Sequence, residues 1–230
     1  MTKKQVLKEI ENDGLSLKYV SDKLRDDKEV VLRAVEIDGS NLEYVSERLK
    51  DDKDVVLLAT KKNVWQLTYV SNRLKDDKDF ALELVKTNGN ALEYLNKNLQ
   101  NDKDIVSEAI KHCGGALNYA SKDLQDDEEI ALKAVSENEF ALRYVSERLY
   151  NNKEFVLKAI KSNPLVLRYA SSQMKSDKDI LLEAIKHDIL LMQYASSKLC
   201  DDEEFMLQAI KINDFALNYV SDRLKKVLNK

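Results

Sequence analysis

Few residues of this chain have the type and spacing that catalysis needs. The sequence holds two histidines, His112 and His187, and no glycine-rich phosphate loop or zinc-binding HExxH motif. The adjacent glycines Gly114 and Gly115 are typical of a turn and do not predict a phosphate site. We therefore expect a protein that is not an enzyme, with no catalytic residue, no cofactor and no metal ligand.

Serine recurs at a fixed interval, which a single nucleophile would not require. No base stands at a fitting spacing from these serines, so we interpret them as structural. A serine two residues after a tyrosine is small enough for close helix approach and can bond back to an earlier carbonyl. The recurring serines are Ser21, Ser46, Ser71, Ser121, Ser146, Ser171, Ser196 and Ser221.

Runs of acidic residues, such as DDEE at 126–129 and again at 201–204, resemble a cation site at first sight. They lack the glycine-punctuated loop of a calcium site. Acids in the first turn of a helix oppose its dipole, which accounts for such runs without a metal. The acidic runs therefore predict helix starts.

A column of lysines gives the clearest alternative to protein binding, because a linear basic edge can follow a nucleic-acid backbone. The net charge of −4 provides no general attraction to phosphate. Three of these lysines follow a glutamate at i,i+3, and cations near a helix C-terminus are favourable in any case. The column comprises Lys61, Lys86, Lys111, Lys161, Lys186 and Lys211.

All these residues recur at one interval, which the tyrosines show most clearly. Nine tyrosines stand 25 residues apart without an insertion or deletion, so the sequence predicts an array of equivalent units in one elongated domain over 1–230. The expected repeats are 1–25, 26–50, 51–75, 76–100, 101–125, 126–150, 151–175, 176–200 and 201–230. The tyrosines are Tyr19, Tyr44, Tyr69, Tyr94, Tyr119, Tyr144, Tyr169, Tyr194 and Tyr219.

Each repeat contains two helix-start signals. The first is a short polar residue followed by an acid three residues later, as in Asp26 and Glu29, which is typical of an N-cap. The second is strongest at Asn163-Pro164, because proline suits the first helical position, and Cys113 is its one departure. The second signals are Asp13, Asp38, Asn63, Asn88, Asn138, Asn163, Asp188 and Asn213.

The pattern therefore predicts an all-α fold, an α-solenoid of about nine helix-turn-helix repeats with about 18 short helices. Apolar residues of the first helix cover an arc of roughly 200°, so this helix should contact both its own partner and the adjacent repeats. In the first repeat Gln5 and Glu9 replace apolar residues, as expected of a polar cap, and Val227 and Leu228 extend the last helix. His112 and His187 then stand three repeats apart, roughly 30 Å, too far to share a metal.

The repeat unit itself resembles a known family. Its signature combines A-[VI] in the first helix with L-x-Y-[VA]-S in the second, and the unit at 26–50 reads DDKEVVLRAVEIDGSNLEYVSERLK. This resembles the tandem helical repeats of domain of unknown function 4116 over essentially the whole chain. The resemblance implies a repeat array often read as a binding module, and it supplies no activity or functional residue.

Composition indicates a soluble protein. No stretch approaches a membrane span, and the N-terminus lacks a secretory core, so we expect a cytoplasmic location or export by a route that reads no N-terminal signal. Cys113 and Cys200 fall at different repeat positions, which is typical of free thiols. We expect a monomer that can self-associate through the array ends.

The positions whose residue type varies from repeat to repeat predict the recognition surface. Pairs such as Glu29 and Arg33 make the first helix look self-neutralising, whereas the outward positions of the second helix vary without a packing rule. We therefore predict a scaffold that binds a protein or peptide on the second-helix layer. The alternatives are a nucleic-acid-binding solenoid that uses the lysine column and a structural spacer. The predicted contact residues are Glu43, Trp65, Lys97, Arg143 and Arg168.

Two predictions concern aromatic residues. Trp65 is the only tryptophan and would serve as an anchor if exposed, but Phe140 and Phe215 occupy the same repeat position, which favours filling the seam between repeats. The tyrosines lie on the flank of the second helix. We interpret the nine as the seam that stacks the repeats.

Overall fold

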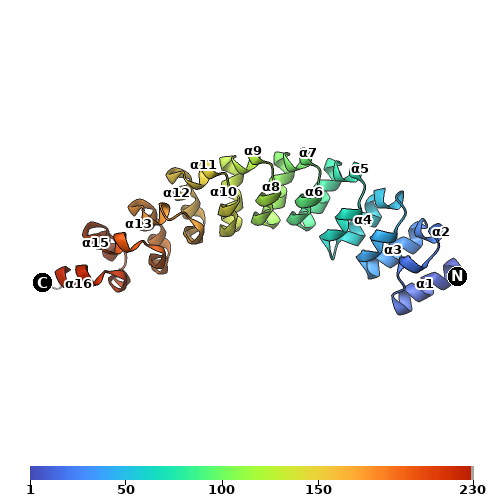
Figure 1. The fold of residues 1–230 in the computed structure, drawn as a ribbon, viewed down its shortest axis with the longest axis horizontal. Helices are drawn as coiled ribbons and strands as arrows, with labels where there is room; N and C mark the ends of the chain where they lie inside the picture. Colours follow the sequence, from blue (N-terminus) through green and yellow to red (C-terminus); the bar gives the residue numbers. More distant parts are fainter. Residues whose placement is uncertain (229–230) are drawn as a thin grey trace. The chain divides into compact units, whose positions relative to one another are not determined.

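The computed structural model describes residues 1–228 and shows an all-helical repeat array (Figure 1). These residues form sixteen α-helices and eleven 3₁₀-helices and no strand. They divide into two compact units, Met1–His112 and a second that starts at Cys113. The predicted all-α array is confirmed, and each unit is described by itself below.

A single repeat contains three helical segments, where the sequence predicted two. In the repeat at 76–100 a long helix, α6 (Lys78–Thr87), is followed by a 3₁₀-helix, η5 (Gly89–Tyr94), and a single turn, α7 (Lys97–Gln100). The predicted second helix is thus divided just after its tyrosine. The physical reason is that Leu95 and Asn96 are both extended, which ends the 3₁₀-helix and starts the short turn afresh.

The first unit stacks its repeats in chain order. Helix α1 packs on α3, α3 on α4 and α6 on α8, and the 3₁₀-helices follow the same order on the other side. The long helices therefore form one layer and the 3₁₀-helices with the short turns form the other. The remaining bounds are α1 Lys3–Asp13, η1 Leu17–Tyr19, α2 Asp22–Arg25, α3 Lys28–Ile37, η2 Gly39–Tyr44, η3 Leu49–Asp51, α4 Lys53–Thr60, η4 Val64–Tyr69, α5 Asn72–Lys75 and α8 Lys103–His112.

The second unit repeats this organisation. Helix α10 packs on α12, α12 on α13 and α13 on α15, with η6, η7, η8, η10 and η11 as successive neighbours in the other layer. The bounds are η6 Gly114–Tyr119, α9 Lys122–Gln125, α10 Glu128–Glu137, η7 Glu139–Arg143, α11 Glu147–Tyr150, α12 Lys153–Ser162, η8 Pro164–Tyr169, η9 Met174–Ser176, α13 Lys178–His187, η10 Ile189–Tyr194, α14 Ser197–Cys200, α15 Glu203–Ile212, η11 Asp214–Tyr219 and α16 Asp222–Leu228.

The long helices begin one residue later than the sequence predicted. The N-cap of α3 is Asp27, whose carboxylate accepts hydrogen bonds from the backbone N–H groups of Glu29 and Val30. Asp26, the predicted cap, bonds instead to side chains of the same repeat. The helix start was correctly located in the chain, but the adjacent acid supplies the cap.

Seven of the eight residues that the sequence predicted to cap the second helix are N-caps of 3₁₀-helices in the structure. Asp38 is typical, since its carboxylate accepts from the backbone N–H of Ser40. The exception is Asp13, which lies inside α1. That helix ends at Gly14 with φ 64°, a left-handed value suited to glycine, and Ser16 caps η1 instead. Cys113 makes no side-chain capping bond, as expected.

The core lies between the two layers of each unit. In the long helix α3, Val30, Val31, Ala34 and Val35 are buried. From the other layer Leu42 joins them with no exposed surface. The polar first repeat is confirmed at Gln5, which is exposed. The side chains of Val227 and Leu228 lie outside the described residues, although α16 continues to Leu228.

The tyrosine ladder follows the 3₁₀ layer at its surface. Seven of its nine members are half-buried, while Tyr19 and Tyr69 are 71% and 39% exposed. Between two repeats of the second unit, the ring of Phe140 packs edge-on against that of Tyr169 at 5.3 Å between centroids. The tyrosines thus flank the core and leave part of each ring accessible.

Candidate partner-binding surface

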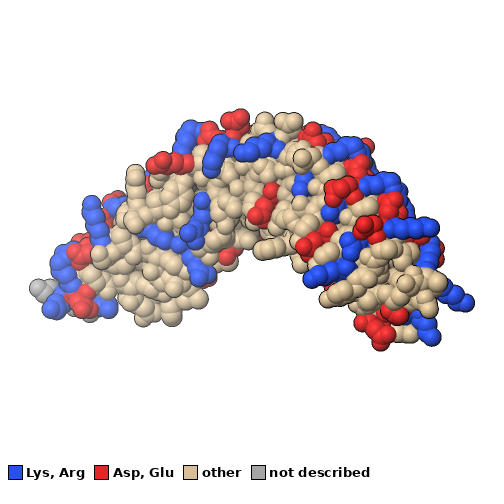
Figure 2. Space-filling model, turned by 45° about the vertical axis from the view of Figure 1, so that its right-hand side comes forward, with Lys and Arg blue, Asp and Glu red and all other residues tan. Residues whose placement is uncertain are grey.

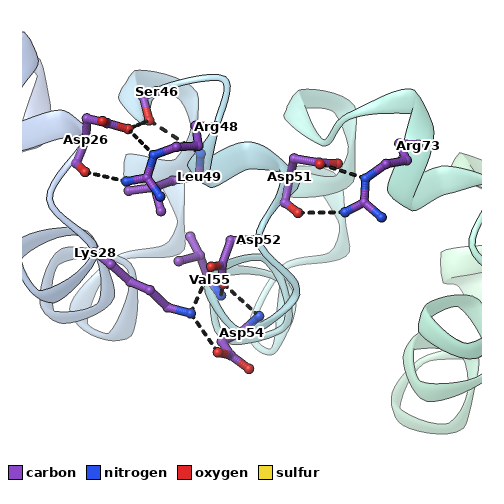
Figure 3. Close-up of polar contacts among 10 residues, drawn as sticks. All are labelled: Asp26, Lys28, Ser46, Arg48, Leu49, Asp51, Asp52, Asp54, Val55 and Arg73. Carbon is purple, nitrogen blue, oxygen red and sulfur yellow. Dashed lines mark hydrogen bonds and ion pairs between the residues drawn. The ribbon is translucent and has the colours of Figure 1, made fainter.

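Most polar side chains of the repeat are committed to holding it together. An aspartate at the first position of a repeat accepts hydrogen bonds from a serine and an arginine near its end, and the serine hydroxyl also caps the short turn (Figure 3). We call these groups the Asp-Ser-Arg clusters. They comprise Asp26, Ser46 and Arg48; Asp51, Ser71 and Arg73; Asp126, Ser146 and Arg148; and Asp201, Ser221 and Arg223.

The clusters also account for four of the eight recurring serines, although not in the predicted way. The hydroxyl of Ser46 donates to the carboxylate of Asp26 and accepts from the backbone N–H of Leu49, so it bonds no earlier carbonyl. Its own backbone N–H donates to the carbonyl of Arg25 in the preceding repeat. The serine therefore joins two repeats as well as capping a turn. The Ser46 hydroxyl and the Arg48 guanidinium hold the pKa of Asp26 below its ordinary value.

A second set of contacts links successive repeats within each unit along the long helices. The ammonium group of Lys28 contacts the carboxylates of Asp52 at 2.8 Å and Asp54 at 2.7 Å (Figure 3). These acids raise the pKa of Lys28. The equivalent lysines are Lys3, Lys53, Lys78, Lys153 and Lys178.

The acidic runs are thus helix caps and ion-pair partners. Within residues 1–228 no group of three or more possible ligands is placed to hold a metal ion.

The ion pair that the sequence predicted between Glu29 and Arg33 does not form. Glu29 pairs with Lys3 and Arg33 with Glu11, because the stacked helices bring these partners of the preceding repeat close. Arg33 also pairs with Glu36, one turn further along α3.

The last residue of five repeats, for example Gln125 and Lys175, supports the 3₁₀-helix of its own repeat. The amide of Gln125 donates to the carbonyls of Leu117, Asn118 and Ala120 at the end of η6, and the carbonyl of Leu117 also accepts from the backbone N–H of Ala120. Lys175 has the same role, since its ammonium group donates a hydrogen bond to the carbonyl oxygen of Arg168 at 2.8 Å. Burial lowers the pKa of Lys175. Sequence reasoning missed this role, whose signal was a long polar side chain at a largely buried position.

Two arginines remain outside this network. Six of the eight arginines pair with a carboxylate: Arg25, Arg33, Arg48, Arg73, Arg148 and Arg223. Within the described part of the chain, the guanidinium groups of Arg143 and Arg168 form neither an ion pair nor a hydrogen bond. Both side chains are exposed, in η7 and η8 of successive repeats. They are also the two arginines that the sequence singled out.

Aromatic rings hold these two guanidinium groups. Arg143 lies over the ring of Phe140 at 4.9 Å, and Arg168 lies over Tyr169 at 5.5 Å. Phe140 in turn packs edge-on between Tyr144 and Tyr169. We call these five residues the arginine-aromatic patch. Cation–π contacts orient a guanidinium without neutralising it, so both groups keep donors for an anionic partner.

Apolar side chains extend the patch along the same layer. Leu165 is 49% exposed and Leu190 52%, at the repeat position that Phe140 occupies. Beside Arg143 a hollow of about 410 Å³ is lined by Val145, Glu147, Tyr150 and Asn151. The second unit therefore offers unpaired cations next to accessible apolar surface.

The other three predicted residues lie in the first unit. Trp65 is 69% exposed in η4, so the seam-filling interpretation does not hold for it, whereas Phe140 at the equivalent position does fill a seam. Glu43 in η2 and Lys97 at the start of α7 are exposed, as the sequence predicted. No contact among these three residues is seen.

The lysine column is exposed at the ends of the long helices, and part of it is neutralised. Lys111 pairs with Glu108 at 2.6 Å and Lys186 with Glu183 at 2.8 Å. His112 lies 3.8 Å from the same Glu108. In the face that Figure 2 shows, basic and acidic side chains alternate along one edge of the repeats.

The comparison with protein families agrees with this repeat structure. The model of a family described as Domain of unknown function (DUF4116) matches five tandem segments, at residues 3–50, 27–75, 77–125, 127–175 and 177–225. The chain belongs to this family. Each DUF4116 match spans about two 25-residue repeats, so the family unit is a pair of the repeats described above.

The other comparisons add no relative. Neither the search of curated proteins nor that of solved structures finds a match to this DUF4116 chain. Among residues 1–228, no helix has both the length and the apolar character needed to cross a membrane.

Proposed function

We propose that this DUF4116 protein is a non-catalytic scaffold that binds an acidic segment of a protein partner on its 3₁₀ layer. The observation that carries the proposal is the arginine-aromatic patch. Its two guanidinium groups have no carboxylate partner among the described residues, while the six other arginines do. Arginine with aromatic neighbours is the composition that dominates binding energy at protein interfaces.

The flanking side chains indicate what the partner carries. Arginine presents a planar set of donors that fits a carboxylate with two hydrogen bonds. Leu165 and Leu190 lie along the same layer and would bury apolar side chains of the segment. A partner segment with alternating acidic and apolar residues fits both features.

Two alternatives are less well supported. A nucleic-acid binder would use the lysine column, but Lys111 and Lys186 are neutralised by neighbouring glutamates. A spacer without a ligand would have no reason to keep two cations unpaired in successive repeats. The binding scaffold accounts for both observations.

A peptide selection tests the proposal. A random peptide library is enriched on the wild-type protein and on the double variant Arg143→Glu/Arg168→Glu. A control, Lys23→Glu/Lys62→Glu, carries the same change in net charge on exposed lysines of the first unit. We expect acidic peptides from the wild type and the control, and their loss from the arginine variant.

Two results would contradict the proposal. Equal enrichment on all three proteins would show that the patch binds nothing. Retention of DNA or RNA that falls steeply with salt, in place of peptide enrichment, would favour the lysine column.

A further inference from the structure

The long-helix layer of the second unit contains a groove that lies apart from the arginine-aromatic patch. It crosses α12, α13 and α15, has a volume of about 500 Å³ and is lined by Leu157, Leu182 and Ile212. Ile212 is 37% exposed, and Leu207 on the same helix is 42% exposed. The groove is therefore an accessible apolar surface on the opposite layer to the 3₁₀-helices.

The apolar lining follows from a recurring leucine. The seventh position of the repeat is leucine in eight of nine repeats, with Ser107 the departure, although the side chain there is only half-buried or exposed. The apolar arc predicted for the first helix includes this leucine, and the structure shows that it lies at the outer edge of the buried face. The leucines are Leu7, Leu32, Leu57, Leu82, Leu132, Leu157, Leu182 and Leu207.

The charges along the groove favour an acidic occupant. Its two acids are already paired, Asp179 with Lys153 at 2.6 Å and Glu183 with Lys186 at 2.8 Å. Lys161 and Lys211, which also line it, form no direct ion pair with a residue of the described chain. Two cations thus remain available beside the apolar side chains.

The first unit provides a contrast without an excess of lysine. An equivalent groove of about 460 Å³ crosses α3, α4 and α6 and is lined by Leu32 and Leu57. Its charged residues are Asp54, Glu83 and Lys61, and since Asp54 is paired with Lys28, one acid and one lysine remain. The positive character of the second groove is therefore specific to that unit and not a property of the repeat.

The spacing of the leucines favours a helical occupant. Neighbouring packed helices lie about 8–10 Å apart, so Leu157 and Leu182 should recur at that interval. Residues seven apart on a helix are separated by about 10.5 Å along its axis and lie on one face. Residues on one face of a strand recur at about 6.7 Å, which matches less well.

We propose that the groove on α12, α13 and α15 docks an amphipathic helix of a partner protein, with apolar residues seven apart and acidic residues on the flank toward Lys161 and Lys211. The apolar face of the helix covers Leu157, Leu182 and Ile212. Carboxylates on its flank pair with the two available ammonium groups.

Two synthetic helical peptides of about three heptads test this assignment. Both carry leucine at every seventh residue, and one carries glutamate on the flank where the other carries lysine. Fluorescence anisotropy measures their binding to the full chain. We expect the glutamate peptide to bind at least about tenfold more tightly, and the variant Lys161→Glu/Lys211→Glu to reverse that preference.

A matched control separates the groove from general charge effects. The variant Lys61→Glu/Lys86→Glu makes the same charge change on the long helices of the first unit and should leave the affinity of the glutamate peptide unchanged. Equal binding of the two peptides, binding of neither, or the same loss in the control variant would overturn the proposal. All four lysines are exposed, and circular dichroism confirms that each variant keeps its helices.

Discussion

At the scale of single residues, one group of polar side chains forms hydrogen bonds and ion pairs within and between repeats, and a second group lacks such partners in the described chain. The Asp-Ser-Arg clusters use their aspartate to bond a serine and an arginine of the same repeat, and lysines such as Lys153 form ion pairs with aspartates of the next repeat. Arg143 and Arg168 differ because aromatic rings, not carboxylates, hold them. This difference in partners is the observation that supports the proposed binding role.

The clusters predict a dependence of stability on pH. The Ser146 hydroxyl and the Arg148 guanidinium lower the pKa of Asp126 in the folded protein. Its contribution is therefore complete above the unfolded pKa of about 3.9 and is lost as pH falls through the lower folded value. The melting temperature of Asp126→Asn should lie below that of the wild type at pH 7, and the difference should shrink as the pH is lowered below the unfolded pKa. A difference that stays constant over this range would contradict the role of the cluster.

Gln125 provides a second residue-scale prediction. It is 5% exposed, and its amide satisfies three carbonyls of the preceding 3₁₀-helix. Gln125→Ala removes this donor from all three carbonyls, of which Leu117 keeps the backbone N–H of Ala120, and should cost about 1–3 kcal/mol in urea unfolding. Cys200→Ala, at the same repeat position without such bonds, should change the stability by less than about 1 kcal/mol. Equal effects of the two variants would show that the cap contributes nothing.

At the scale of elements, the sequence predicted where helices begin better than how they end. The alternation of two start signals located the long helices and the 3₁₀-helices. The pattern of an acid three residues after the cap favoured Asp26 over the adjacent Asp27, which is the residue that caps the helix. Contacts with Ser46 and Arg48, distant in the chain, decide between them.

The division of the second helix could not be predicted for a related reason. Leu42, Val45 and Leu49 have the spacing of one continuous helical stripe. The structure breaks between them because Ser46 bonds the preceding repeat through its backbone and Asp26 through its side chain. Both are contacts across the repeat that local sequence does not reveal.

The close packing of η2 against α4 gives a prediction at the scale of elements. A Cβ added to Gly39 in η2 would lie 2.3 Å from the carbonyl oxygen of Ala59 in α4, whereas one added to Gly115 would meet only the Cys113 sulfur, at 3.7 Å. Gly39→Ala must separate η2 from α4 and should destabilise by about 1–3 kcal/mol. Gly115→Ala should be neutral or slightly stabilising. Urea unfolding of the two variants measures this, and tolerance of Gly39→Ala would contradict the packing described.

At the scale of the whole molecule, each unit is a stack in which a repeat is covered by its neighbours. Leu167 in η8 is fully buried, and Leu217 at the same repeat position in η11 is 51% exposed. The difference arises because no described repeat follows η11. Burial at this position therefore comes from the next repeat and not from the repeat's own helices.

A pair of substitutions tests this nearest-neighbour organisation. Leu167→Asp places a charge in the core and should lower the stability of the second unit by several kcal/mol, about 3–5. Leu217→Asp should cost less than about 1 kcal/mol, because the carboxylate stays in water. Equal losses in thermal unfolding would mean that Leu217 is covered in solution.

The central claim is that the arginine-aromatic patch binds an acidic segment, and hydrogen exchange tests it most directly. The full chain is measured with and without an acidic peptide enriched by the wild-type protein. We predict slower backbone exchange in and around η7 and η8, over residues 139–172, and no such change in Arg143→Glu/Arg168→Glu. Protection confined to other repeats, or protection of 139–172 that persists in the double variant, would contradict the account.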